Sequence, residues 1–249
     1  MFTTPHALLF LLLIALTTRA QSTPDVNRFL ENAQVKSDFG KVTLIANDPR
    51  PLVQAVEALR DHYHWSINYE DPVYRPSDMS GVKTKLVSSR KFVTTFEEVS
   101  GTDVQAEKHR VIAKVVSDYN LSSNPGHFAI RGDGPGGSPS VVGISAGTVE
   151  TTPIFDTSIS MKKQVRSAEE SILEVLQQIE LRTGIKVSLA SGPIRRLKES
   201  QVEVGAENTE ARKLLESVLW SAQGSRRLNY KLLYDPDLKH YYLNISVGD

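Results

Sequence analysis

The segment His62-Tyr63-His64 holds the side chains that could most directly bind a metal ion. Zinc sites on helices place two histidines four positions apart, so that both rings lie on one face. His62 and His64 are only two positions apart near a predicted helix end, and no carboxylate lies at the spacing of a metal ligand. We interpret them as exposed helix-end histidines that complement the helix dipole when protonated. The sequence therefore predicts no metal site and no cofactor.

A glycine-rich segment, residues 132–137 (GDGPGG), raises the question of phosphate binding. A phosphate loop follows a strand, opens a helix and usually ends in Lys-Ser or Lys-Thr. Predicted strands flank this segment on both sides, so we interpret it as a hairpin turn. The chain also has no cysteine, which excludes thiolate catalysis and disulfides. No Ser-His-Asp phrase or nucleophile elbow is visible, so an enzyme with a scattered site is the least favoured hypothesis.

Two basic clusters and two tryptophans could bind larger ligands. Residues 195–198 (RRLK) and 226–227 (RR) form either a site for a polyanion or solvated loop charges. The chain has 29 basic and 29 acidic residues, and this zero net charge argues against nucleic acid as a partner. Trp65 and Trp220 could be stacking platforms for sugars, but their places in the apolar periodicity favour the core.

Residues 1–20 are predicted to be a signal peptide. Residues 8–16 (LLFLLLIAL) are apolar and uncharged, but too short to span a bilayer, which takes about 20 residues. Thr18 and Ala20 supply small residues at the usual cleavage spacing, although residues 1–7 carry no Lys or Arg. A retained membrane anchor is the alternative. Cleavage after Ala20 predicts a periplasmic or secreted protein with no membrane span.

The rest of the chain contains two similar series of elements. Residues 50–69 (RPLVQAVEALRDHYHWSINY) align without a gap with residues 170–189 (ESILEVLQQIELRTGIKVSL). In each segment, apolar residues three and four apart predict a helix, and a switch to alternation predicts a strand. Ser167 and Glu170 form a capping box at the start of the second helix, and Gly184 marks its end.

The second part of each series agrees as well. Residues 105–119 and 208–220 predict helices, the latter with Asn208 as its cap. Each helix leads into a hairpin, over 127–144 and over 228–245. The difference in residue number between aligned positions falls from 120 in the first part to 103 in the second. The first series therefore carries an insertion of 17 residues near 70–101.

These elements predict an α+β fold made of two similar small units, each a β-α-β-β-α-β-like sheet with two helices packed on one face. The predicted order is the signal peptide (1–20), an N-terminal extension (21–40), the first unit (41–146), a linker (147–157) and the second unit (158–249). The predicted core includes Leu52, Val56, Leu59, Trp65, Ile67, Ile172, Leu176, Ile179, Ile185 and Val187.

Residues 184–189 (GIKVSL) and 202–215 (VEVGAENTEARKLL) resemble the secretin and TonB short N-terminal domain. The resemblance covers about 80 residues of the second unit and, less clearly, the first. It rests on apolar positions and turns, without a catalytic signature. The 17-residue insertion departs from the pattern, and we expect no secretin ring or outer-membrane barrel after Asp249. What the resemblance implies is a small periplasmic docking module.

We therefore expect an exported, non-enzymatic docking protein of the bacterial cell envelope, whose partner is another envelope protein. A binding module for an envelope glycan or a small ligand is the alternative. The predicted interaction surface is the closing hairpin, because edge strands offer unpaired main-chain groups to a partner strand. By alternation, the residues that should face inward are Tyr230, Leu232, Tyr241, Leu243 and Ile245. Those that should face outward are Lys231, His240, Tyr242 and Asn244. If the hairpin pairs with the first unit, or if the linker covers it, this edge is not available.

Overall fold

The computed structural model describes residues 33–47, 50–79, 91–99, 101, 103–134, 138–146, 151–224 and 226–248. The predicted signal peptide, most of the N-terminal extension and residues 80–90 of the predicted insertion lie outside these ranges. Residues Asn32–Asp249 form one compact unit, to which everything below refers. In the described part of the chain, no helix is long and apolar enough to cross a membrane.

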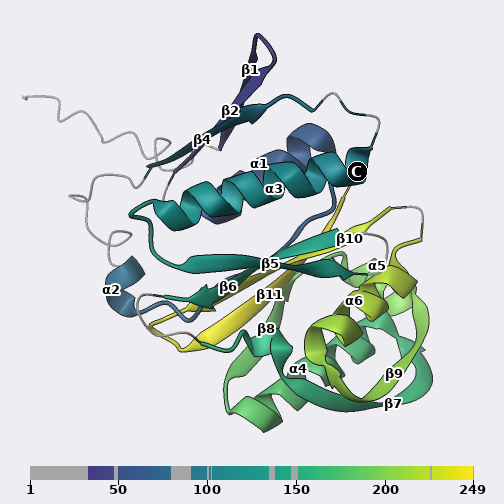
Figure 1. Cartoon of the computed structure of the whole chain (residues 1–249). Coiled ribbons are helices and arrows are strands. Elements are labelled where there is room, and N and C mark those ends of the chain that lie inside the picture. The colour runs from purple at the N-terminus through teal and green to yellow at the C-terminus, as the bar shows by residue number, and fades with distance from the viewer. Residues whose placement is uncertain are drawn as a thin grey trace, which may run out of the picture. The chain divides into compact units, whose positions relative to one another are not determined.

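Helices and strands are interspersed along this unit, and the predicted α+β class is confirmed (Figure 1). The helices are α1 (Pro51–Tyr63), α2 (Pro76–Met79), α3 (Val104–Leu121), α4 (Ala168–Thr183), α5 (Ile194–Glu199) and α6 (Ala211–Ala222), with a 3-10 turn, η3 (Ile154–Asp156). The strands are β1 (Gln34–Asp38), β2 (Lys41–Asn47), β3 (Asn68–Glu70), β4 (Lys91–Glu97), β5 (His127–Gly134), β6 (Ser138–Ser145), β7 (Ser158–Ser167), β8 (Lys186–Ser191), β9 (Gln201–Glu210), β10 (Leu228–Asp235) and β11 (His240–Val247).

Local sequence sets the ends of the helices. Glu170 N–H donates to the Ser167 hydroxyl and the Glu170 carboxylate accepts from Ser167 N–H, so the predicted capping box is present. Gly184 ends α4 in the left-handed conformation, with φ of 70°, which glycine adopts without a steric penalty. Asp103, which the sequence analysis did not single out, caps α3 by accepting from two backbone N–H groups.

The same order of elements occurs twice. The first half runs β2, α1, β3, β4, α3, β5 and β6, and the second runs β7, α4, β8, β9, α6, β10 and β11. The short helices α2 and α5 occupy corresponding places, after β3 and after β8. The order of elements matches the order that the sequence predicts, while the duplication of two separate units stays a prediction.

The strands do not form one small sheet in each unit, as the sequence predicts. β1, β2 and β4 form a three-stranded sheet, and β7 and β9 form a two-stranded sheet. The other strands join into one six-stranded sheet with the order β5-β6-β3-β10-β11-β8. Each half thus contributes three strands in equivalent order to this common sheet, and the parallel pairing of β3 with β10 joins the halves.

The two helix pairs cover opposite faces of the six-stranded sheet. The second half repeats the strand pattern of the first with every strand reversed, since β3 runs parallel to both β6 and β10. A half-turn about an axis in the sheet, perpendicular to the strands, keeps the strand order, reverses every strand and exchanges the two faces. The helices of the second half therefore cover the opposite face from those of the first. Figure 1 accordingly shows α1 and α3 between this sheet and the β1-β2-β4 sheet, and α4 and α6 on the other side, against β7 and β9.

Burial follows from this layering. Nine of the ten predicted core residues are buried, and Ile185 is partly buried. The sequence predicted a strand with one buried face at 65–69, yet every residue from Trp65 to Asp71 is buried. The reason is that β3 is an inner strand of the sheet, with helices on both of its faces.

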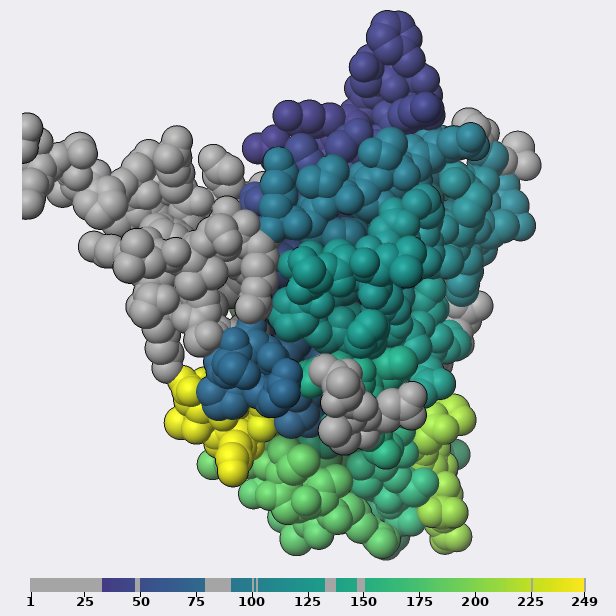
Figure 2. All heavy atoms as spheres, turned by 60° about the vertical axis from the view of Figure 1, so that its left-hand side comes forward, coloured from purple at the N-terminus to yellow at the C-terminus, as the bar shows by residue number. Residues whose placement is uncertain are grey.

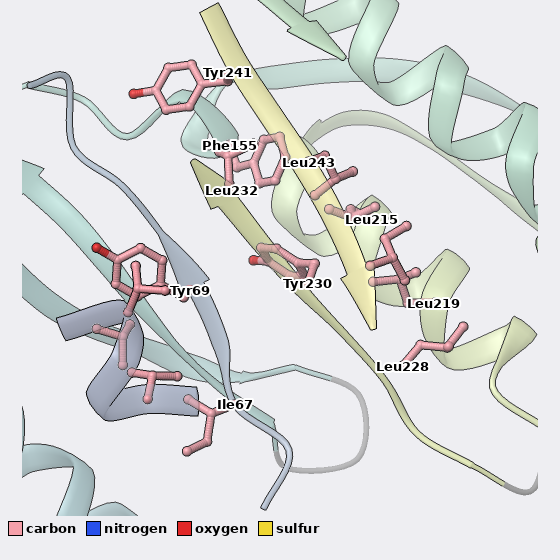
Figure 3. Packing of buried hydrophobic residues seen from close by; sticks show 14 of the residues in the cluster. Ile67, Tyr69, Phe155, Leu215, Leu219, Leu228, Tyr230, Leu232, Tyr241 and Leu243 are labelled. Carbon is pink, nitrogen blue, oxygen red and sulfur yellow. The ribbon is translucent and has the colours of Figure 1, made fainter. Parts of the chain in front are cut away.

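One local prediction is wrong. Asn208 does not cap a helix, because β9 continues to Glu210 and α6 begins only at Ala211. Within the predicted linker, Ile154 and Phe155 are buried. The ring of Phe155 lies 5.8 Å from that of Tyr230, and Figure 3 shows it within the cluster that covers β10 and β11.

Candidate functional site

The closing hairpin is not a sheet edge. β10 pairs with β3 on one side, and β11 pairs with β8 on the other, so both strands lie inside the six-stranded sheet. The prediction that their main chain accepts a partner strand is wrong, and pairing with the first half, the alternative, is what the structure has. Any recognition here must use side chains.

The predicted alternation along the hairpin is confirmed. The five residues expected to face inward, Tyr230, Leu232, Tyr241, Leu243 and Ile245, are all buried. The four expected to face outward, Lys231, His240, Tyr242 and Asn244, are all partly exposed. Figure 3 shows four of the inward residues, Tyr230, Leu232, Tyr241 and Leu243, in one cluster with the α6 residues Leu215 and Leu219. The outward row therefore lies on the opposite face of the sheet.

Neighbouring side chains order this outward row. The rings of His240 and Tyr242 stack, with centroids 4.4 Å apart and 7° between their planes. His240 Nε2 lies 2.9 Å from the hydroxyl of Ser188, and the Ser191 hydroxyl donates to Asn244 Oδ1 at 2.7 Å. Among the described residues, none hydrogen-bonds the hydroxyl of Tyr242. The row thus presents a fixed aromatic pair with an available phenol group.

An open groove of about 350 Å³ extends this surface toward α1. Lys231 forms an ion pair with Glu57 of α1, and Arg60 donates to the hydroxyl of Ser246. The residues on the sheet side include Lys231 and Asn244. We call Lys231, His240, Tyr242 and Asn244 with Ser188 and Ser191 the docking face.

A buried ion pair joins the two halves beneath this surface, and the sequence analysis missed it. Arg212 of α6 donates through Nε and Nη2 to the two carboxylate oxygens of Glu70 on β3, at 2.7 and 2.8 Å. The Tyr230 hydroxyl donates to Glu70 Oε1 at 2.7 Å, and Arg212 also pairs with Asp156. Burial works against the charged guanidinium, but the hydrogen bonds and charge of Glu70 more than offset this and raise the pKa of Arg212.

A second buried carboxylate ties the same strands together. Asp71 accepts from the Tyr69 hydroxyl at 2.8 Å and from the backbone N–H of Tyr234 at 2.9 Å, and it lies 2.8 Å from Arg50 Nε. Burial raises the pKa of Asp71 even though the charge of Arg50 acts in the opposite direction. These contacts lock β3 to β10, so we assign Asp71 and Glu70 a structural role.

One carboxylate lies at the boundary between this network and solvent. Glu216 accepts from the Ser140 hydroxyl at 3.0 Å, and burial together with the charge of Glu70 raises its pKa to about 7. It borders a small pocket of about 20 Å³ next to Trp220, which leaves room for about one water molecule. Trp220 is 45% exposed, so its predicted place in the core is wrong, whereas Trp65 is buried as predicted.

The remaining candidates are dispersed. His62 and His64 are exposed, and the described residues contain no group of three or more His, Cys, Asp or Glu placed to hold a metal ion. Strands β5 and β6 flank the glycine-rich turn, of which residues 135–137 lie outside the described ranges. The two basic clusters do meet, since Arg196 Nη2 donates to the Arg226 carbonyl at 3.0 Å.

Comparisons with protein-family models, curated proteins and solved structures find no match to this chain.

Proposed function

We propose that this protein is an exported, non-enzymatic docking protein of the bacterial cell envelope, and that it binds another protein through the docking face. The observation that supports this most is the ordered outward row on β11. Stacking and hydrogen bonds hold His240, Tyr242 and Asn244 in place before any partner arrives. Such preorganisation lowers the entropy cost of binding, and tyrosine is enriched among the residues that dominate binding energy.

The resemblance to the secretin and TonB short N-terminal domain belongs to this proposal. The recurrence of one element order in both halves supports it, because a duplicated small module gives such a recurrence. Export to the periplasm is part of the same proposal and rests on the apolar run at 8–16.

A binding module for an envelope glycan or small ligand is the second candidate. Trp220 favours it, because this half-exposed ring lies beside a pocket lined by Ser66, Asn68 and Ser138. An indole with neighbouring polar groups can stack on a sugar ring. Quenching of Trp220 fluorescence by envelope glycan fragments, absent in Trp220→Phe, would favour this candidate over protein docking.

Protection of position 242 from a thiol reagent tests the docking proposal. The chain has no cysteine, so Tyr242→Cys introduces a unique thiol. We expect a membrane-impermeant maleimide to label this thiol in the purified protein and at least tenfold more slowly in intact envelopes, where the partner covers it. Val165→Cys, at an exposed site on β7, is the control and should react equally in both. Equal labelling of position 242 in both preparations would contradict the proposal.

A further inference from the structure

Most sheet edges in the described part of the chain are protected against pairing. On β5, the side chain of Asn120 donates to the Phe128 carbonyl at 2.8 Å and accepts from the Phe128 N–H at 2.9 Å, in place of a neighbouring strand. The ladder of β5 with β6, that of β8 with β11 and that of β7 with β9 all contain register shifts. Natural sheets use such irregularities to block edge-to-edge association.

Strand β1 is protected by charge. It lies at one edge of the three-stranded sheet, in a hairpin that Figure 2 shows in purple, projecting from the residues around it. Antiparallel pairing of β1 with a second copy would centre on Lys36 and place this side chain opposite itself. Like charges directly opposite each other destabilise a strand pair.

Strand β4, at the other edge of this sheet, is regular and long. It pairs with β2 over seven consecutive residues, from Lys91 opposite Asn47 to Glu97 opposite Lys41, without a register shift. The N–H of Glu98 donates to the Gly40 carbonyl at 2.9 Å, which fixes the alternation of the ladder. Even-numbered residues of β4 therefore bond to β2, and the odd-numbered ones direct their main-chain N–H and C=O groups to the side on which no described strand pairs with β4.

The β4 sequence, KFVTTFE, is complementary to itself when it is read in the antiparallel direction. With Thr94 opposite its own copy, Lys91 faces Glu97, Phe92 faces Phe96, and Val93 faces Thr95. The facing pairs that exchange hydrogen bonds are then 91 with 97 and 93 with 95, which are the residues whose main-chain groups point outward. The exposed face would carry a Lys–Glu pair at each end.

We propose that two copies of this chain associate through antiparallel pairing of β4 with β4, about a twofold axis at Thr94. The two three-stranded sheets become one six-stranded sheet with the order β1-β2-β4-β4-β2-β1. This isologous contact goes beyond the docking face, which it leaves free in both copies, so a dimer presents that face twice.

Charged groups of α3 lie beside the proposed axis and must be accommodated. Asp118 accepts from the Thr94 hydroxyl and pairs with Lys114 at 2.7 Å, and Arg110 Nη2 donates to the Glu97 carbonyl at 3.2 Å. Two Asp118 carboxylates would approach each other in the dimer, and each brings its own Lys114 as a countercharge. Arg110 occupies only one of the edge carbonyls, and a carbonyl oxygen accepts two hydrogen bonds.

Charge exchange between Lys91 and Glu97 tests the proposal, with sedimentation equilibrium as the measurement. The wild-type protein should be a reversible dimer. Lys91→Glu places Glu opposite Glu97, and Glu97→Lys places Lys opposite Lys91, so each single variant should dimerise at least tenfold more weakly. The double variant restores opposite charges and should dimerise as the wild type does. Both side chains are exposed, so thermal melts at protein concentrations too low for dimers to form should be unchanged.

Mixing the two single variants gives a sharper result. A Lys91→Glu copy carries two acidic ends and a Glu97→Lys copy two basic ends, so the mixture should form a heterodimer although each variant alone dimerises at least tenfold more weakly than the wild type. A monomeric wild type at all concentrations would overturn the proposal. A dimer that neither single variant weakens would also overturn it, because the contact would then lie elsewhere. Neither result bears on labelling at position 242, so the two proposals can fail separately.

Discussion

Arg212→Met is expected to lower the free energy of unfolding by about 3–5 kcal/mol, the largest effect that we predict for a single substitution. The side chains of Arg212 and Glu70 are 6% and 1% exposed. Removal of the guanidinium leaves the Glu70 carboxylate buried without a countercharge, with only the Tyr230 hydroxyl still donating to it. Urea unfolding at pH 7, followed by circular dichroism, measures the loss.

The matched control removes both charges. In Arg212→Met combined with Glu70→Gln, no buried charge is left unpaired, and the amide can still accept from Tyr230. The double variant should therefore regain most of the stability that the single variant loses. A single variant within about 1 kcal/mol of the wild type would show that the ion pair does not hold the two halves together.

Glu216→Gln is expected to stabilise the protein in alkaline solution and not in acid. The pKa of Glu216 is raised from its ordinary value of 4.5 to about 7, so the folded state favours the protonated acid. This contribution to stability is fully present below about pH 4.5 and is lost as the pH rises through about 7. The neutral amide avoids the loss, and the pKa difference corresponds to at most about 3 kcal/mol.

Urea unfolding at pH 4.5 and pH 8 measures this effect. The variant and the wild type should be equally stable at pH 4.5, and the variant should be more stable at pH 8. Glu199→Gln is the control, because this carboxylate lies on the exposed surface of α5, paired with Arg195, and should give no comparable gain. A difference between Glu216→Gln and the wild type that is the same at both pH values would contradict the assigned burial.

Local features of the fold could be predicted from the sequence, because neighbouring residues determine them. The capping box of Ser167 and Glu170 and the left-handed Gly184 depend on contacts within a few residues. The alternation of inward and outward side chains in the hairpin that contains Tyr230 and Ile245 could also be predicted, since side chains on one face of a strand repeat every two residues. Asn208 shows the limit of such signals, because pairing of β9 with β7 outweighs its preference for a helix cap.

The joining of the halves could not be predicted, because it depends on residues far apart in the chain. Parallel pairing places Tyr69 opposite Lys231, and no local pattern indicates that contact. The same pairing converts the predicted edge hairpin into inner strands and buries both faces of β3. Glu70 and Arg212 are charged, and charged residues are usually exposed, so only their spatial proximity explains their burial. The four outward residues predicted for the docking face are therefore partly exposed as expected, but their strands have no unpaired main-chain edge to offer a partner.

Photocrosslinking from position 242 in the native envelope tests the central claim most directly. A photoreactive phenylalanine analogue in place of Tyr242 should form a discrete adduct with another protein, and the same analogue at the exposed Val165 should not. His240→Ala should weaken the adduct, because His240 holds the ring at position 242 by stacking. Recovery of only intramolecular products, together with turnover of an envelope substrate that a single polar substitution abolishes, would contradict docking and identify the protein as an enzyme.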